Sequence, residues 1–296
     1  QVPRVGFGRG IFTKLPELIE DYRKKSYVVF ILDHAHKTTG LLDRLPSKSE
    51  DFVLLVDTTN EPKTSQIDEL RDEVLHANSG KLPSLVVGIG GGSAMDIAKA
   101  ISVMLTNKGS SILYQGWDLV GQPGIYKIAI PTLSGTGAEA TRTCVMTNKK
   151  SGLKLGMNSD YTVFDQIILD PELTSTVPRD QYFYTGMDTF IHCIESLSGN
   201  YRNAIGDAFS NQAIQLCREV FLSDDMMSDE NRQKIMVASY LGGCAIGNSL
   251  VGVLHPVSAG LSVVLNIHHC LANCITITAM GQFYSTEVKE FLEKEE

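Results

Sequence analysis

An acidic residue and a histidine stand four positions apart in an apolar segment of the chain, residues 186–196 (GMDTFIHCIES). In a helix, Asp188 and His192 at i and i+4 project from neighbouring turns on one face. Two polar side chains on the apolar face of a helix either pair with each other or share a third group. A second apolar segment, residues 254–273, adds three histidines: His255, His268 and His269.

One carboxylate and three imidazoles form a ligand set that suits a first-row divalent ion such as Fe²⁺ or Zn²⁺. Asp188 and His192 are spaced as paired metal ligands on a helix are, and two of the later histidines would complete the set. The alternative is a buried hydrogen-bonded pair with unrelated histidines. The residue types and the first spacing leave both interpretations open.

A glycine-rich segment, residues 88–96 (GIGGGSAMD), follows a predicted strand and opens a predicted helix. Backbone N–H groups at such a helix N-terminus can hold a pyrophosphate. The segment is neither G-x-G-x-x-G, because Met95 stands at the third glycine position, nor a P-loop. A purely structural turn is the alternative, and Ser93 could cap the helix instead of binding a phosphate oxygen. The candidate cofactor residues here are Gly90, Gly91, Gly92, Ser93 and Asp96.

A second loop, residues 131–139 (PTLSGTGAE), places small hydroxyl residues and glycines at the end of another predicted strand. Two such loops at the carboxyl ends of parallel strands are where an open α/β sheet binds a nucleotide. Asp33 ends the first strand and could accept a hydrogen bond from a ribose hydroxyl, which favours NAD over NADP; turn or capping chemistry is its alternative role. The candidates in the second loop are Thr132, Ser134 and Thr136.

The first part of the chain alternates strand and helix patterns, and the last part reads as helices. Predicted strands at 26–33, 52–57, 84–92 and 126–137 alternate with amphipathic helices, which indicates a mostly parallel sheet covered on both faces. We therefore expect an α/β nucleotide-binding domain over 1–176 and an all-α metal-binding domain over 177–296.

Composition excludes several classes of protein. The net charge is −8 with no basic stripe, so a nucleic-acid surface is not expected. No apolar run reaches the roughly 18 residues that a membrane helix needs. All six cysteines lie between residues 144 and 274 without a C-x-x-C pair, which indicates reduced, mostly buried thiols in a cytoplasmic protein.

Five phrases together resemble the iron-containing alcohol dehydrogenases, whose fold is related to that of dehydroquinate synthase: GGGSAMD, PTLSGTGAE, ILDPELT, GMDTFIHCIES and HHCLAN. The family's metal motif is an aspartate followed by three histidines at spacings of 4, 63 and 14. The chain has the same spacings at Asp188, His192, His255 and His269. The resemblance also implies that Lys154 contacts the cofactor.

The chain departs from the family pattern at three places near the implied metal. Ala259 replaces a family histidine often assigned to proton relay, and Cys270 replaces the glycine after the last ligand. GTGAE stands where the family has GTGSE. His268 is the candidate for the proton-relay role, with simple surface exposure as the alternative.

Within the family, the sequence resembles the branch of 3-deoxy-D-manno-octulosonate (Kdo) 8-oxidases. That branch oxidises a terminal primary alcohol to an aldehyde ahead of amination to an 8-amino sugar for lipopolysaccharide biosynthesis. The implied chemistry lowers the pKa of the substrate hydroxyl at the metal and passes hydride to NAD. An oxidase would also need dioxygen as acceptor, and the sequence has no flavin or haem signature, so the terminal acceptor stays open.

Three alternatives to Kdo oxidation remain. The first is an NAD-dependent dehydrogenase of small alcohols or polyols from the same family. The second is a lyase of the dehydroquinate synthase type, which needs several basic residues that the segments around the predicted ligands lack. The third is a non-catalytic metal- or nucleotide-binding protein. We expect a homodimer that acts on a small alcohol or sugar acid and binds neither nucleic acid nor membrane.

Overall fold

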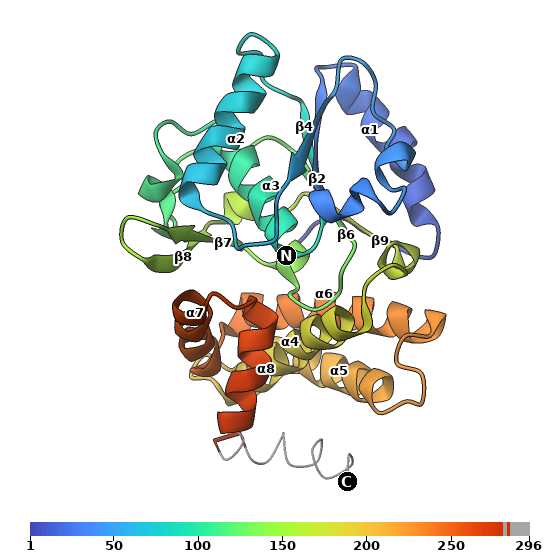
Figure 1. The fold of residues 1–296 in the computed structure, drawn as a ribbon, viewed down its shortest axis with the longest axis vertical. Helices are drawn as coiled ribbons and strands as arrows, with labels where there is room; N and C mark the ends of the chain where they lie inside the picture. Colours follow the sequence, from blue (N-terminus) through green and yellow to red (C-terminus); the bar gives the residue numbers. More distant parts are fainter. Residues whose placement is uncertain (281–282, 285–296) are drawn as a thin grey trace. The chain divides into compact units, whose positions relative to one another are not determined.

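The computed structural model describes residues 1–280, 283 and 284. Two compact units make up the chain. The α/β unit consists of Gln1–Thr132 and Arg142–Asp170, and the helical unit consists of Leu133–Thr141 and the chain from Pro171 onward. This division confirms the predicted fold class, a parallel-sheet α/β part followed by helices (Figure 1).

The α/β unit is built on a six-stranded sheet in the order β1-β9-β6-β4-β2-β3, in which every neighbouring pair is parallel. Figure 1 shows α1 on one face of this sheet and α2 and α3 on the other. The strands are β1 Val5–Phe7, β2 Val28–Asp33, β3 Phe52–Val56, β4 Leu85–Gly90, β6 Lys127–Pro131 and β9 Gln166–Leu169. The helices are α1 Leu15–Arg23, α2 Thr64–Ala77 and α3 Gly92–Met104.

The strands β2 and β4 carry apolar residues and glycine up to the Asp33 that ends β2, because helices cover both faces of the sheet. Every residue of β4 is buried, and β2 is buried from Val28 to Leu32. Gly90 at the end of β4 has φ +151°, and a Cβ there would lie 2.8 Å from the Cβ of Asp33 and 2.6 Å from that of Ala94. Only glycine allows this close approach between the ends of β2 and β4 and the start of α3.

A small second sheet lies in the α/β unit and was not anticipated from the sequence. Its order is β5-β8-β7, from Gly116–Trp117, Leu153–Asn158 and Thr143–Asn148. Side chains along β7 alternate between half-buried and buried, a pattern that its mixed composition (TCVMTN) conceals. The Asp96 carboxylate on α3 accepts a hydrogen bond from the Val145 N–H at 3.0 Å and so holds β7 against the helix.

The helical unit has five α-helices among the described residues. They are α4 Arg179–Ser198, α5 Ala204–Phe221, α6 Asp229–Ser249, α7 Leu254–Leu265 and α8 His269–Met280. α4 packs against α5, α6 and α8, and its residues Phe190, Ile191 and Ile194 belong to the apolar core of the unit. Five of the six cysteines are buried and Cys274 is half-buried. Small thiols of this kind serve as core residues.

The boundary between the units differs from the predicted one after residue 176. The Asp170 carboxylate accepts hydrogen bonds from the Gly10 and Phe12 N–H groups at 3.0 and 2.9 Å, which ties the chain to the α/β unit up to that residue. The segment Leu133–Thr141 belongs to the helical unit. Its Gly135 N–H donates to the Ser239 hydroxyl at 2.7 Å, and the Thr189 hydroxyl donates to the Gly135 carbonyl at 2.7 Å.

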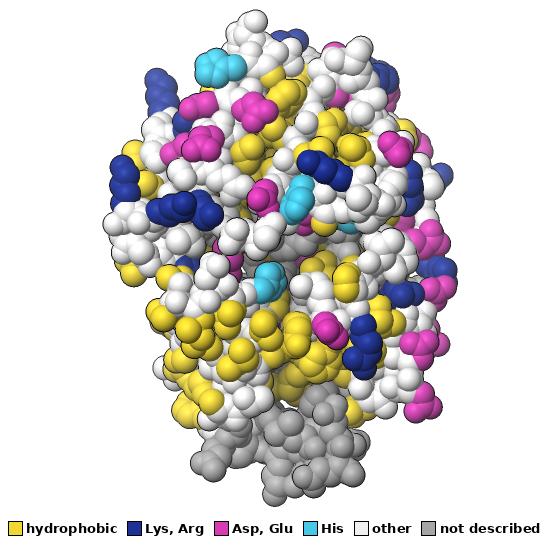
Figure 2. Space-filling view, in the orientation of Figure 1, with side chains coloured by type: hydrophobic (Ala, Val, Ile, Leu, Met, Phe, Trp, Pro, Cys, Tyr) yellow, Lys and Arg dark blue, Asp and Glu magenta, His cyan; other side chains and the backbone are white. Residues whose placement is uncertain are grey.

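Hydrophobic side chains gather on the surface of the helical unit (Figure 2). The outer face of α7 contributes Val257, Val263, Val264 and Leu265, all of them exposed.

No single helix in the described part of the chain is long and apolar enough to cross a membrane. The helices α6 and α7 pass that test only when taken together, and the chain bends by 110° between them. The expected homodimer stays a prediction.

The packing of Gly135 predicts a specific loss of stability. A Cβ at this position would lie 1.6 Å from the Thr185 carbonyl oxygen, so Gly135→Ala must displace backbone. We expect the substitution to lower the free energy of unfolding of the helical unit by roughly 2–4 kcal/mol in urea titrations followed by circular dichroism. Gly247→Ala on α6 is the control, because a Cβ there meets open space. Equal unfolding free energies for the two variants would contradict this account.

Candidate metal centre

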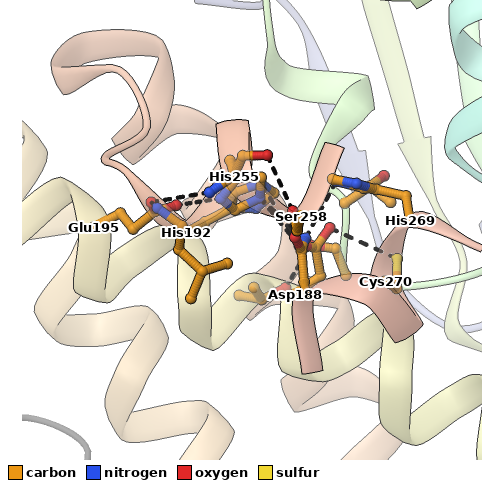
Figure 3. Close-up of polar contacts among 12 residues, drawn as sticks. Asp188, His192, Glu195, His255, Ser258, His269 and Cys270 are labelled. Carbon is orange, nitrogen blue, oxygen red and sulfur yellow. Dashed lines mark hydrogen bonds and ion pairs between the residues drawn. The ribbon is translucent and has the colours of Figure 1, made fainter. Parts of the chain in front are cut away.

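Three helices of the helical unit bring a carboxylate and two imidazoles together (Figure 3). Asp188 lies on α4, His255 at the start of α7 and His269 at the start of α8. One ligand atom from each lies within 4.8 Å of the other two. The His255 Nε2 atom is 3.3 Å from the Asp188 Oδ1 atom. Residues up to 81 positions apart in the sequence (269 minus 188) thus converge on one point.

His192 lies beside this group, one turn after Asp188 on α4. Its ring stacks on that of His255 with a centroid distance of 4.5 Å and an interplanar angle of 14°. Its Nε2 atom is 3.9 Å from Asp188 Oδ1, and its Nδ1 atom is buried with no hydrogen-bond partner among the described residues. A buried ring nitrogen without a partner is costly, and Nε2 rather than Nδ1 is the nitrogen that faces Asp188.

The Asp188 carboxylate is fully buried, and its surroundings keep it charged. Burial alone would raise the pKa of Asp188, but the neighbouring imidazoles of His192, His255 and His269 lower it well below its usual range. Its Oδ2 atom also accepts a contact from the Cys270 thiol at 3.7 Å. A permanently charged carboxylate beside imidazoles is the state in which a carboxylate binds a cation.

The histidines differ in their protonation. Burial lowers the pKa of His192 to about 4, so its ring is neutral at neutral pH and keeps a lone pair. Burial also acts to lower the pKa of His255, but hydrogen bonds to Asp188 and Glu195 raise it to about 9. A cation at this point would therefore take the place of a proton that Asp188 and His255 otherwise share.

Asn273 supports the interpretation of this point as a cation site. Its side-chain Nδ2 group donates to Asp188 Oδ1 at 2.5 Å and lies 3.2 Å from the Nε2 atoms of both His255 and His269. Its Oδ1 atom accepts a hydrogen bond from the Ser258 hydroxyl, which fixes the direction of the amide. A partly positive N–H₂ group thus faces the same three atoms that would face a metal. The donor set fits a divalent cation.

Glu195 and Asn273 were not among the residues predicted from the sequence. Glu195 is fully buried on α4, and its carboxylate accepts a hydrogen bond from His255 Nδ1. Burial acts to raise the pKa of Glu195, but its contacts with His255 lower it overall. The signal in the sequence is spacing: Glu195 follows Asp188 at i+7 on the same helical face, and Asn273 follows His269 at i+4.

The structure does not bring His268 into the cluster through any described contact with Asp188 or His255. Its side chain is exposed, and its Nδ1 atom accepts a 3.4 Å hydrogen bond from the Cys270 N–H at the start of α8. Its proposed part in proton relay stays a prediction. Ala259 is half-buried on α7, one turn after His255.

Within the α/β unit, three of the predicted cofactor residues meet at the carboxyl ends of β2, β4 and β6. Thr132 N–H donates to the Gly90 carbonyl at 2.9 Å, and the Asp33 Cβ packs against Gly90. The Thr132 hydroxyl pairs with His36 Nε2 at 2.8 Å, and Asp33 accepts from the Ala35 N–H at 3.0 Å. Asp33 therefore has the capping contact that was its alternative role.

The helix after the glycine-rich loop begins at Gly92, with Gly91 as its N-cap and no side-chain cap. Ser93 lies inside the first turn, so the alternative in which it caps the helix does not apply. An N-terminus capped by glycine leaves its backbone N–H groups available to an anion. This arrangement suits the predicted pyrophosphate site.

Of the four remaining cofactor candidates, three have a contact with another residue of the chain and one is a buried hydroxyl without a hydrogen-bond partner among the described residues. Lys154 forms an ion pair with Glu61, 2.5 Å from Nζ to Oε2, and burial raises the pKa of Asp96 to about 6. In the helical unit, the Thr136 hydroxyl accepts from the Ala138 N–H at 3.3 Å. The buried Ser134 hydroxyl has no hydrogen-bond partner among the described residues, as a ligand-binding hydroxyl would.

Comparison with known proteins connects this geometry to a family. Residues 3–171 match the model for iron-containing alcohol dehydrogenase, and residues 182–294 match its C-terminal family model. Sulfoacetaldehyde reductase of Bilophila wadsworthia is 35% identical over 236 residues, which is 78% of this chain and 59% of that protein. The chain therefore spans little more than half the length of this curated relative.

Solved structures show the same fold. A 1,3-propanediol oxidoreductase superposes with a TM-score of 0.85 at 24% identity, covering 95% of this chain and 74% of the other. The sulfoacetaldehyde reductase of Bifidobacterium kashiwanohense, solved in complex with NAD⁺, gives a TM-score of 0.81 at 27% identity with the same coverage. The two family models, which together cover most of the sequence, show that the chain belongs to the iron-containing alcohol dehydrogenase family.

Proposed function

We propose that this chain is a metal-dependent oxidoreductase that interconverts an alcohol and an aldehyde with NAD. The observation that carries the proposal is the convergence of Asp188, His255 and His269, with His192 stacked alongside, in a buried part of the helical unit. A hydrogen-bonded pair of Asp188 with one histidine would not need the other two imidazoles beside it.

In this proposal Asp188, His192, His255 and His269 hold the metal, and Fe²⁺ is the ion that the family name favours over Zn²⁺. A bound divalent ion supplies Lewis acidity that lowers the pKa of a substrate hydroxyl. The chain itself contributes the charge of Asp188, the neutral ring of His192 and a buried environment that excludes water. His268, which is exposed beside His269, is our candidate for exchanging the hydroxyl proton with solvent.

NAD is the proposed hydride carrier, and its pyrophosphate and ribose are proposed to bind to the α/β unit. Support comes from the glycine-capped N-terminus of α3, from Asp33 at the end of β2, and from the relative solved with NAD⁺. The backbone N–H groups at the start of α3 would bind the pyrophosphate, and Asp33 would bind a ribose hydroxyl. The other proposed contacts are Gly90, Gly91, Gly92, Ser93, Asp96, Thr132, Ser134, Thr136 and Lys154.

The lyase alternative is less well supported. A dehydroquinate synthase-type reaction relies on lysines and arginines that hold an acidic substrate group. Among the described residues, the side chains that contact Asp188, His192 and His255 include carboxylate, amide and thiol groups but neither lysine nor arginine. An alcohol substrate needs no such cationic group.

The finer proposal concerns the substrate. We propose a polyhydroxylated acid, with oxidation of the terminal primary alcohol of Kdo for lipopolysaccharide biosynthesis as the specific reaction. Ala259 supports this, because it leaves about one ring's volume at a position where the family usually has histidine. The relatives reported above act, by their names, on sulfoacetaldehyde and 1,3-propanediol. Oxidation of a small alcohol or polyol by the same residues is the alternative.

Removing a ligand should remove the metal. We expect Asp188→Asn and His269→Ala to lose bound iron or zinc, measured by elemental analysis of purified protein, while circular dichroism stays that of a folded chain. The reason is that both side chains point at the proposed metal and Asn cannot supply the negative charge. Asp180→Asn at the exposed start of α4 is the matched control and should keep its metal. Full metal occupancy in Asp188→Asn would end the assignment.

Blocking the glycine-rich loop should weaken NAD binding. Gly91→Val places a branched side chain at the N-cap of α3, where the pyrophosphate would lie. We expect the Kd for NAD⁺, measured by isothermal titration, to rise at least about tenfold, or roughly 1.4 kcal/mol. Gly247→Ala on α6 serves as the control. An unchanged Kd in Gly91→Val would place the cofactor elsewhere.

Ala259→His tests the substrate proposal. The added imidazole should narrow the site and supply a general acid–base group, which is worth roughly 10²–10⁴-fold in rate. We expect the ratio of kcat/KM for a sugar acid to that for a short diol to fall at least about tenfold. Ala279→His on α8 provides a control for histidine insertion. A wild type that already prefers the short diol would leave the small-alcohol alternative as the better account.

A further inference from the structure

Glu195 contacts both the backbone and the ring of one predicted ligand, His255. Its Oε1 atom accepts hydrogen bonds from the backbone N–H groups of Leu254 at 2.7 Å and His255 at 3.2 Å. Its Oε2 atom accepts from the Nδ1 atom of the same His255. The Tyr284 hydroxyl also reaches Oε1 at 3.4 Å. One fully buried carboxylate thus holds both the backbone and the ring of His255 (Figure 3).

The backbone contacts replace a cap that α7 lacks. The N-cap residue of α7 is Val253, which has no side-chain acceptor, and the first N–H groups of a helix need one. Glu195 supplies the acceptor from α4, and its negative charge also matches the positive end of the helix dipole. The position of His255 at the start of α7 therefore depends on a residue 60 positions earlier in the chain.

The contact between Glu195 and the His255 ring determines which ring nitrogen of His255 can bind a metal. A carboxylate can only accept, so the His255 Nδ1 atom must carry the proton. When a cation replaces the proton between Nε2 and Asp188, 3.3 Å away, the lone pair of Nε2 is then the one that faces it. Glutamate is the side chain of this length with two acceptor oxygens, and both are used here. Glutamine has one acceptor and one donor and cannot satisfy both contacts.

We infer that Glu195 is a positioning residue for the metal centre, which sets the tautomer of His255 and its place on α7 at the same time. The inference rests on the proposed metal site and adds a determinant of its affinity. Carboxylates that orient a ligating histidine typically change metal affinity by about 10- to 100-fold. A role in capping alone would leave metal affinity unchanged when the cap is preserved.

Glu195→Gln separates the two roles. Its amide oxygen can still accept from the Leu254 and His255 N–H groups, while its N–H₂ group would face His255 Nδ1 and favour a proton on Nε2. We expect Co²⁺ affinity, measured by titrating metal-stripped protein and following the visible d–d absorption, to fall about 10- to 100-fold. Glu219→Gln on α5 is the control, because Glu219 pairs with Lys234 at the surface and should give wild-type affinity.

Glu195→Asp provides a second test, because the positioning role and the capping role predict opposite orders of Co²⁺ affinity for the Asp and Gln variants. Aspartate keeps two acceptors and the charge but is one methylene shorter. We expect its Co²⁺ affinity to lie between those of wild type and Glu195→Gln, whereas a capping role that depends on reach would place Gln above Asp. Gln binding Co²⁺ as tightly as wild type, or more tightly than Asp, overturns the inference.

A measurement on the wild type covers the case in which Glu195→Gln does not fold. In Zn²⁺-loaded protein labelled with ¹⁵N-histidine, the His255 ring should carry its proton on Nδ1 and bind through Nε2, with His255→Asn identifying the signal. A zinc bond through Nδ1 overturns the inference. If wild type binds neither Co²⁺ nor Zn²⁺, the proposed function fails and the inference falls with it, whereas tight wild-type binding with an unaffected Gln variant overturns the inference alone.

Discussion

The buried polar residues of the helical unit are arranged around the negative charge of Asp188. A carboxylate with no exposed surface is expensive to bury unless opposite charge and hydrogen bonds surround it. Each neighbour found around it meets part of that need: imidazoles from three helices, the Asn273 amide and the Cys270 thiol. The packing of α4 against α8, and the placement of α7, are therefore tied to one buried charge.

The need to surround the Asp188 charge also bears on why two of the predicted metal ligands lie at helix N-termini. His255 and His269 each stand in the first turn of a short helix, where backbone N–H groups lack partners within the helix. Glu195 satisfies those of α7 and orients His255 with its second oxygen. An error of one turn in either helix would move an imidazole about 5 Å, more than a metal bond allows.

The sheet and the helices could be predicted from the sequence because each central element has a clear pattern of apolar and polar residues. β2 and β4 are continuous apolar runs, and α4 carries its polar residues at i and i+4. The family resemblance, rather than periodicity, singled out His255 and His269 from the other histidines. The small sheet of β5, β7 and β8 was missed because its strands mix polar and apolar residues. Glu195 was missed because its role appears only when α7 is placed against α4.

The polar face of α4 also argues that these residues are kept for function. Apolar side chains of similar size at Asp188, His192 and Glu195 would pack into the same core and commonly leave a protein equally stable or more so. Three buried polar residues at i, i+4 and i+7 are a poor choice for stability alone. Their contacts all lead to one group of atoms, the Asp188 carboxylate and the imidazoles around it. Such buried polar residues are expected where a cation binds to them, because the binding free energy offsets the part of the desolvation cost that protein contacts do not compensate.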